Sequence, residues 1–380
     1  MAHDTSATWC EPAAPSQRAE WAALLAQAHI DGLTPAEQRG EIDDVLISIA
    51  ADPAVSVRRA LAITIAGAET VPPGLIRLLS RDSDSVAAPV IRSSPHLSDE
   101  DLIERFSSER PKLREAILAR QTLSERVTGA IIPMADFNEV RVLLDHQGAM
   151  FSGQTLRRIA EAHGDDASLR GALVERSDLP ADLRQYLMLK TSEAVASSPL
   201  VALALGERRG RTIGTEACQR GTATILGSAQ KSELTPLIDR LVAAEQLSPA
   251  VMLRLACSGS LEGLSESLSR LSGVKPVRVR SILVEGRHKP FAALCERAGL
   301  PSACVAILFH AVAVWRNADE DGEMLTDGEV AARIMQRMAS ELGKGDADTM
   351  APALAFLRGL SREAGVRRPS SSPSTDVVAA

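Results

Sequence analysis

Aromatic residues are scarce in this chain. Phe, Trp and Tyr make up 3% of the 380 residues, and Tyr186 is the single tyrosine. The alternation of β-branched and polar residues that is typical of half-buried strands is almost absent. Ala, Leu, Arg and Glu dominate instead, and all of them favour helices. The sequence therefore predicts an all-α chain with almost no sheet.

Cysteine is also rare, and its spacing excludes a zinc ribbon. The five cysteines are scattered and form no CxxC pair. Cys257, Cys295 and Cys304 lie among apolar helical residues, so we predict that they are small core hydrophobes. This usage fits a reducing compartment, and the predicted location is the cytoplasm.

Long apolar runs are missing. Residues Met1 to Ser16 lack the basic start and apolar stretch of a usual signal peptide. The most apolar helix, predicted over Pro301 to Trp315 and interrupted by His310, is shorter than the ~18 residues needed to cross a bilayer. We predict a buried core helix there and no membrane span.

A basic surplus is absent from the chain as a whole, which carries a net charge of −7. This balance argues against a nucleic-acid partner. The charge is uneven, however. Residues 194–300 hold 14 Lys and Arg against 9 Asp and Glu, so this segment is +5 and the rest of the chain is −12.

Catalytic motifs are missing too. The sequence contains no HExxH, GxxxxGK or GxSxG motif. His146 follows Asp145 at a predicted helix end, where the helix dipole favours a histidine, and this explains the pair better than acid–base chemistry does. We therefore predict a protein that is not an enzyme, with no catalytic residue and no cofactor.

An acidic segment, Asn317 to Leu325, imitates a calcium-binding EF-hand loop. It has oxygen ligands at positions 1, 3 and 5 and a glycine at position 6. The calcium loop needs a carboxylate at position 12, where this chain has Gly328, with Glu329 one residue late. We predict a solvated acidic turn, with Asp327 capping the next helix, and no metal site.

What the chain does have is a repeat of about 28 residues. Apolar residues followed by helix-start residues recur at intervals of 26 to 28, and a second series of apolar residues recurs at intervals of 27 to 29. The first series is Val71, Leu97, Leu123, Phe151 and Leu179, and the second is Val57, Val86, Leu113, Val140 and Leu169. A fixed period of 20–50 residues is typical of solenoids.

An Asp precedes an Arg by five or six residues in several of these repeats, as in Asp52/Arg58, Asp136/Arg141 and Asp165/Arg170. HEAT-like repeats resemble this pattern, with Asp and Arg side chains linking neighbouring units. The predicted fold is therefore an all-α, HEAT-like or leucine-rich-variant-like helical-repeat solenoid with a less regular helical C-terminal half.

Several motifs also resemble a family of alphaproteobacterial helical-repeat proteins that is known only as a domain of unknown function. The similarity covers roughly residues 70–315 and implies no active-site residue. The motifs are Ser94-Pro95-His96-Leu97-Ser98, Ala119-Arg120-Gln121-Thr122-Leu123-Ser124, Gly148-Ala149-Met150-Phe151-Ser152, Arg176-Ser177-Asp178-Leu179-Pro180, Leu271-Ser272-Gly273-Val274 and Arg297-Ala298-Gly299-Leu300-Pro301.

The repeat and the composition together predict the domain layout. It comprises a disordered N-terminus (1–16), a helical-repeat solenoid (17–195), an irregular and mildly basic helical continuation (196–316), an acidic loop with C-terminal helices (317–364) and a disordered tail (365–380).

Two functions remain open at this point. The first is an interaction scaffold that binds a protein partner through its helical-repeat surface. The alternative is a sensor of a small anionic, nucleotide-like ligand, bound through arginine clusters in 194–300. The candidate residues are Arg208, Arg209, Arg211 and Arg220, beside Gly210, Gly214 and Gly221, which would allow a close backbone approach. Arg278, Arg280, Arg287, His288 and Lys289 form a second cluster.

Overall fold

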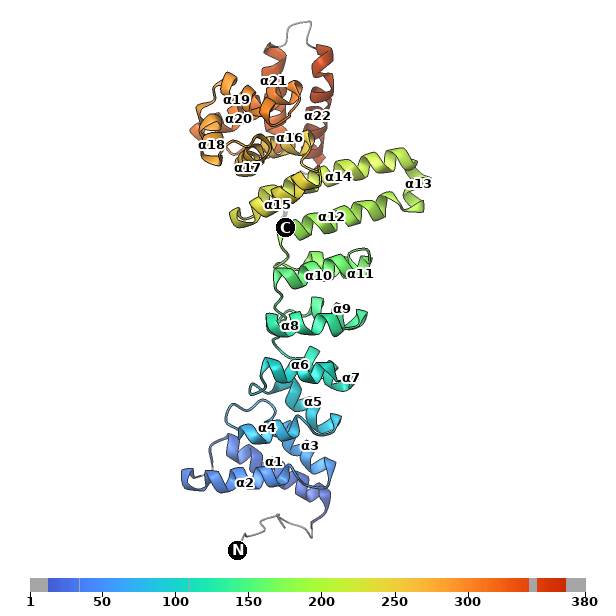
Figure 1. The fold of residues 1–380 in the computed structure, drawn as a ribbon, viewed down its shortest axis with the longest axis vertical. Coiled ribbons are helices and arrows are strands. Elements are labelled where there is room, and N and C mark those ends of the chain that lie inside the picture. The colour runs from blue at the N-terminus through green and yellow to red at the C-terminus, as the bar shows by residue number, and fades with distance from the viewer. Residues whose placement is uncertain (1–12, 34, 109, 342–346, 367–380) are drawn as a thin grey trace, which may run out of the picture. The chain divides into compact units, whose positions relative to one another are not determined.

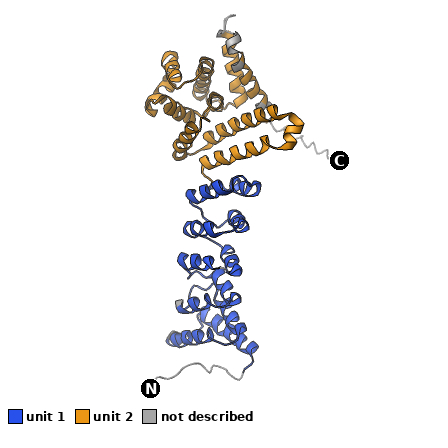
Figure 2. Cartoon of the chain, turned by 45° about the vertical axis from the view of Figure 1, so that its right-hand side comes forward, with its two compact units in different colours: residues 1–178 blue, residues 179–380 orange. Residues whose placement is uncertain are grey.

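The computed structural model describes residues 13–33, 35–108, 110–341 and 347–366, and these residues form helices and connecting turns without any strand. The all-α prediction is therefore confirmed for this part of the chain. The predicted disordered ends fall outside the described residues, except for residues 13–16 and 365–366. The chain divides into two compact units, residues 1–178 and 179–380 (Figure 2).

Unit 1 is a succession of short helices (Figure 1). They are α1 (Pro15–Ile30), α2 (Arg39–Ile49), α3 (Val55–Ile65), α4 (Pro73–Leu79), α5 (Asp84–Ser93), α6 (Asp99–Ser107), α7 (Pro111–Leu118), α8 (Glu125–Ile131), α9 (Phe137–Asp145), α10 (Gly153–His163) and α11 (Ala167–Glu175), with 3-10 turns at Ala36–Gln38 and Ile132–Met134. From α1 to α11, each odd-numbered helix packs on the next odd-numbered helix.

Serine and aspartate side chains cap five helix starts in unit 1. The side chains of Ser98, Ser124 and Ser152 each accept a hydrogen bond from the backbone N–H three residues later, at the starts of α6, α8 and α10. Asp136 and Asp166 do the same for α9 and α11. These bonds satisfy N–H groups that a helix start leaves without a partner inside the helix.

The second periodic series forms the interior of unit 1. Val57, Val86, Leu113, Val140 and Leu169 are all buried, one on each odd-numbered helix from α3 to α11. In the first series, Val71, Leu123, Phe151 and Leu179 are buried, whereas Leu97 is half-buried against the core formed by α1 to α5. Nine of these ten periodic positions are therefore buried, and the expectation that Leu97 is as buried as Leu123, Phe151 and Leu179 was wrong.

The loops between the helices also contact one another. The backbone N–H of Leu123 donates to the carbonyl of Gly148 (3.0 Å), and the carbonyl of Leu123 accepts from the N–H of Met150 (2.9 Å). Leu123 and Ala149 thus form an isolated parallel bridge. Gly148 permits this close approach, because a Cβ there would collide with the carbonyl oxygen of Gln121.

Unit 2 begins with a long helical hairpin and continues into a larger core. Its helices are α12 (Ala181–Ala196), α13 (Pro199–Leu205), α14 (Glu207–Ser228), α15 (Lys231–Ala243), α16 (Pro249–Cys257), α17 (Leu261–Ser272), α18 (Pro276–Glu285), α19 (His288–Arg297), α20 (Ser302–Asp321), α21 (Asp327–Glu341) and α22 (Ala347–Val366). Because α12 packs on α14 and α15, the division between the units at 178/179 precedes the predicted boundary at 195/196.

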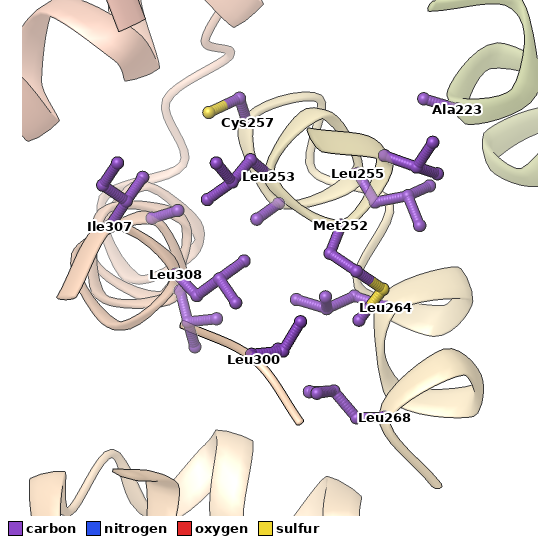
Figure 3. Close-up of a cluster of buried hydrophobic side chains, with 14 of the residues drawn as sticks. Ala223, Met252, Leu253, Leu255, Cys257, Leu264, Leu268, Leu300, Ile307 and Leu308 are labelled. Atoms are coloured by element: carbon purple, nitrogen blue, oxygen red, sulfur yellow. The ribbon is translucent and has the colours of Figure 1, made fainter. Parts of the chain in front are cut away.

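The core of unit 2 lies between α16, α17 and α20, where Met252, Leu264 and Leu308 point toward one another (Figure 3). Trp315 closes one side of this core. Its indole N–H donates to the carbonyl of Ala256 (2.8 Å), and its ring lies against Gly259, whose φ of +73° favours glycine.

Two sequence expectations in unit 2 were wrong. The predicted acidic loop is helical as far as Asp321, because α20 buries Ala318 on its inner side and ends only at Gly322, with a φ of +65°. Asp327 does not cap α21, since Thr326 accepts the N–H of Glu329 in that role.

Candidate functional site

Charged side chains link successive helices of unit 1. In three of four pairs an arginine bonds to a carboxylate near the start of a later helix, and in the fourth Arg110, just before α7, bonds to Asp84 at the start of the earlier helix α5. The pairs are Arg18–Asp52, Arg58–Asp82, Arg110–Asp84 and Arg114–Glu139. Arg58 holds both oxygens of Asp82, and these hydrogen bonds lower the pKa of the Asp82 carboxyl. Such two-pronged pairs fix geometry as well as charge.

The Asp and Arg residues of the five- or six-residue pattern do not pair with each other through their side chains. Arg58 donates to the backbone carbonyl of Asp52 (2.7 Å), not to its carboxylate. Arg170 likewise donates to the carbonyl of Asp165 (3.2 Å). Arg141 bonds to Asp145 and to Ser168 instead of Asp136. The Arg side chains therefore serve the structure, as predicted, but several of their acceptors are main-chain oxygens.

A second set of links joins the loops of unit 1, and sequence reasoning missed it. Arg120 donates to the carbonyls of Ile91 and Ser94, and Arg176 donates to those of Leu144 and Ala149. His96 and His146 reach the carbonyls of Ala68 and Arg120 in the same way. Each bond crosses 26 to 32 residues of sequence. Arg120, Arg176 and His96 lie within the family-like motifs of the sequence, and His146 lies two residues before the motif that starts at Gly148.

The ring of His146 has both nitrogens engaged. Nε2 lies 2.7 Å from the carbonyl of Arg120, which can only accept, and Nδ1 lies 3.0 Å from the backbone nitrogen of Gly148, which can only donate. The ring is therefore the neutral Nε2–H tautomer. A histidine held in this way positions two loops and has no free nitrogen for acid–base catalysis.

A polar groove of ≈ 680 Å³ opens beside His146, between the C-terminal ends of α9 and α11. Its lining carries both signs of charge, with Arg141 and Arg176 opposite Asp145, Glu175 and Asp178. Arg176 is anchored by Asp178 (2.8 Å) and stacks over the ring of Phe151. Both arginines of the groove are therefore paired with carboxylates, Arg141 with Asp145 (2.8 Å) and Arg176 with Asp178, whereas Glu175 is exposed.

The predicted arginine cluster lies on α14 of unit 2. Arg208, Arg209 and Arg211 are exposed in the first two turns of the helix, and Arg211 donates to Glu207 (3.1 Å). Arg220 is half-buried and about 14 Å further along the helix, given the rise of 1.5 Å per residue. The structure thus groups three of the four candidates and separates the fourth.

The glycines beside this cluster serve helix packing. A Cβ on Gly210 would lie 3.0 Å from Val201 of α13, and one on Gly214 would lie 3.0 Å from Ser192 of α12. A Cβ on Gly221 would collide with Met188. These glycines were expected to let a ligand approach the backbone closely, but the space beside them is taken by side chains of α12 and α13.

A second groove, of ≈ 410 Å³, lies between α12, α14 and the turn before α16. Arg211, Glu193 and the hydrogen-bonded pair Gln185 and Thr222 (3.0 Å) contribute to its lining. Glu245, also in the lining, has a φ of 54° and is the one non-glycine residue with positive φ among the described residues. This groove joins one candidate arginine to several amide and hydroxyl groups.

The second basic cluster surrounds the turn between α18 and α19. Arg278 and Arg287 share the carboxylate of Glu285, each at 3.7 Å, and Arg280 lies 3.9 Å from Glu262. His288 stacks edge-on against Phe309. The cations of this cluster are therefore partly neutralised on the surface of unit 2.

The described residues offer no cluster of metal ligands, and two of the cysteines are deeply buried. No cluster of three or more His, Cys, Asp or Glu side chains suited to a metal ion occurs in that part of the chain. Burial raises the pKa of the Cys257 and Cys295 thiols to about 12, so both remain protonated and unreactive near neutral pH. Both are small core residues, as the sequence predicted.

The fold and its surfaces define an all-helical protein in which, over the described residues, no helix is long and apolar enough to cross a membrane. Residues 86–344 match a family described as "Uncharacterised protein conserved in bacteria (DUF2336)", and the chain belongs to this family. No curated protein and no solved structure matches the chain.

Proposed function

We propose that this chain is a non-enzymatic scaffold of HEAT-like helical repeats that binds a protein partner in the cytoplasm. The 28-residue period, the packing of each odd-numbered helix on the next, and the arginine links between successive helices support the repeat arrangement. In such an arrangement, the faces that neighbouring units do not use are free for a partner.

The polar groove between α9 and α11 carries this proposal. The groove has a volume of ≈ 680 Å³ and a charged lining, which suit an extended peptide segment with both signs of charge. His146 is not expected to contact the peptide, because its ring is bonded to the backbone of two loops. Gln147 and Glu175 line the groove with exposed side chains, so they are where a partner would make contact. Electrostatic complementarity of this kind sets specificity and association rate more than affinity.

The test is capture of a partner from the native host by the full chain and by a groove variant, Gln147→Lys/Glu175→Lys. The matched control is Glu104→Lys/Glu161→Lys, which changes exposed residues of α6 and α10 outside the groove lining. We expect the parent and the control to capture the same protein and the groove variant to lose it. Binding must then be reproduced with that purified protein, and equal capture by all three chains would contradict the proposal.

The second candidate function is a sensor of a small anionic ligand. The groove of ≈ 410 Å³ favours it, because Arg211 lines this groove beside amide and hydroxyl groups. Arginine suits phosphate because its planar guanidinium remains charged and donates two parallel hydrogen bonds.

A thermal-shift series with a panel of nucleotides tests the sensor. A ligand that binds only the folded state raises stability in proportion to RT ln(1 + [L]/Kd). The triple variant Arg208→Ala/Arg209→Ala/Arg211→Ala should fold normally, because exposed substitutions usually change stability by less than about 0.5 kcal/mol. It should lose the shift if the arginines bind the ligand. A panel without any shift favours the scaffold.

A further inference from the structure

The end of the helical hairpin in unit 2 exposes a set of aliphatic side chains. All seven residues of α13, Pro-Leu-Val-Ala-Leu-Ala-Leu, are apolar and described, and none of them is buried. Figure 1 shows α13 where α12 and α14 are joined. We name this surface the hairpin tip; its exposed side chains are Leu200 (77%), Leu203 (87%), Leu205 (43%), Val195 (51%) and Ile213 (45%).

The hairpin tip is held firmly in place. Gly210 allows α14 to approach Val201 of α13, and Gly214 allows the same helix to approach Ser192 of α12. Gly206, with a φ of +76°, reverses the chain between α13 and α14. Because a seven-residue helix that buries none of its side chains gains little stability by itself, the position of α13 depends on these contacts with α12 and α14. The tip therefore presents a fixed apolar projection that can enter another apolar phase.

Cations lie directly beside this projection. Arg208, Arg209 and Arg211 follow α13 within six residues, and Glu207 is the single acidic residue among them. All three arginines are exposed. Aliphatic side chains next to arginines are typical of segments that lie in the interface of an anionic bilayer, where the apolar groups enter the acyl region and the cations contact lipid phosphates.

Two observations argue against a second copy of the chain as the occupant. A two-fold contact between hairpin tips would bring the arginines of both copies together, because such a contact uses the same patch twice. Five aliphatic side chains also provide much less than the ~800 Å² that each partner buries in a standard interface.

We infer that the hairpin tip docks on an anionic membrane surface. With seven residues and a rise of 1.5 Å each, α13 is about 10 Å long, so it lies in the interface and does not cross the bilayer. Few apolar groups enter the membrane, so binding is weak, reversible and reduced by salt. This inference is independent of the peptide groove in unit 1.

The test is cosedimentation of the full chain with vesicles of phosphatidylcholine alone or with about 30% phosphatidylglycerol, in low and high salt. The tip variant is Leu200→Ser/Leu203→Ser, and the charge variant is Arg208→Gln/Arg209→Gln. The matched control is Val277→Ser/Val284→Ser on α18, where the valines are exposed to a similar degree (77% and 74%) and also lie beside arginines.

We expect the parent and the control to bind the anionic vesicles equally and the neutral vesicles several-fold less. The tip variant should lose roughly tenfold in binding, and the charge variant should lose its salt dependence. A Leu203→Trp variant should show a blue-shifted emission on vesicle addition, relative to the parent, which reports entry into the apolar phase.

Three results would overturn the inference. The first is a parent that does not bind anionic vesicles. The second is equal binding by the parent and the tip variant. The third is a parent dimer, by light scattering, that the tip variant converts to a monomer, since this would assign the hairpin tip to a second copy of the chain. Circular dichroism of each variant confirms that its fold is unchanged.

Discussion

Arg58 of α3 donates two hydrogen bonds to the carboxylate of Asp82, just before α5. Nε lies 2.6 Å from Oδ2, and Nη2 lies 2.9 Å from Oδ1. The side chains of both residues are largely shielded from solvent, so the pair contributes more than an exposed ion pair would. It joins α3 to the start of α5, across 24 residues of sequence.

Replacing Asp82 with Asn should lower the free energy of unfolding by roughly 1–3 kcal/mol, between the values for exposed and buried pairs. The pKa of Asp82 is lowered from its ordinary 3.8, so its contribution is fully present above that value and is lost as the pH falls through the folded-state pKa. Urea unfolding at about pH 7 and about pH 3 should show a smaller difference from the parent in acid. Glu100→Gln, in an exposed pair with Arg126, is the control and should change little.

Truncating Leu123 to Ala should cost roughly 2–5 kcal/mol, because the side chain is buried beside a loop-to-loop bridge. The control is Leu78→Ala on α4, whose side chain is exposed. Chemical denaturation of both variants measures the difference. A loss below about 0.5 kcal/mol at Leu123 would show that its burial contributes nothing to stability.

Two glycines in unit 1 should respond to alanine in opposite directions. At Gly148, a Cβ collides with the carbonyl of Gln121, so Gly148→Ala must separate two loops and should destabilise the chain by about 1–3 kcal/mol. At Gly171, inside α11, a Cβ meets no atom within 4 Å, so Gly171→Ala should stabilise by about 0.5–1 kcal/mol. Melting temperatures that move the same way for both variants would refute this reading of the loop contact.

The acidic segment from Asn317 to Glu329 should not bind calcium tightly. Residues 317 to 321 are helical, and alternate residues on a helix point about 200° apart, so their oxygens cannot converge on one ion. Titration calorimetry should give no dissociation constant below roughly 10⁻⁵ M, the sensor range. A tighter constant would require α20 to unwind when the ion binds.

The periodic apolar series predicted the fold class and much of the interior. Val57, Val86, Leu113, Val140 and Leu169 could be assigned to the core because their spacing alone requires one buried position in each repeat. The serine caps were predictable for a similar reason, since the bond from Ser98 to the N–H of Asp101 is local in sequence.

The loop links were not predictable. Arg120 and His146 donate to main-chain oxygens, and a carbonyl has no signature in the sequence because every residue has one. The packing role of Gly214 depends on where α12 lies, which only the folded chain shows. The end of α20 was misjudged because Asp319, Glu320 and Asp321 suggested a turn, although the helix continues as far as the glycine after them.

The sequence identified the arginines of the candidate anion site, but not which of them lie together in the fold. Arg208, Arg209 and Arg211 lie together, but Arg220 does not, because nine residues of helix separate it from Arg211. Nothing in the sequence selects α13, since Leu200 and Leu203 would be equally suited to a core. Exposure is a property of the folded chain, and it is what distinguishes these leucines from buried ones such as Leu187.

The loop-to-loop hydrogen bonds from Arg120, His146 and Arg176 require a particular side chain only in the loop that donates. The donor must be a side chain that carries an N–H or O–H group, here an arginine or a histidine, whereas the acceptor can belong to any amino acid whose backbone has the right path. A segment that carries its own donor can therefore join almost any predecessor. Such one-sided chemistry suits a chain that lengthens by copying a segment in frame, because the new copy needs no matching change in the segment before it.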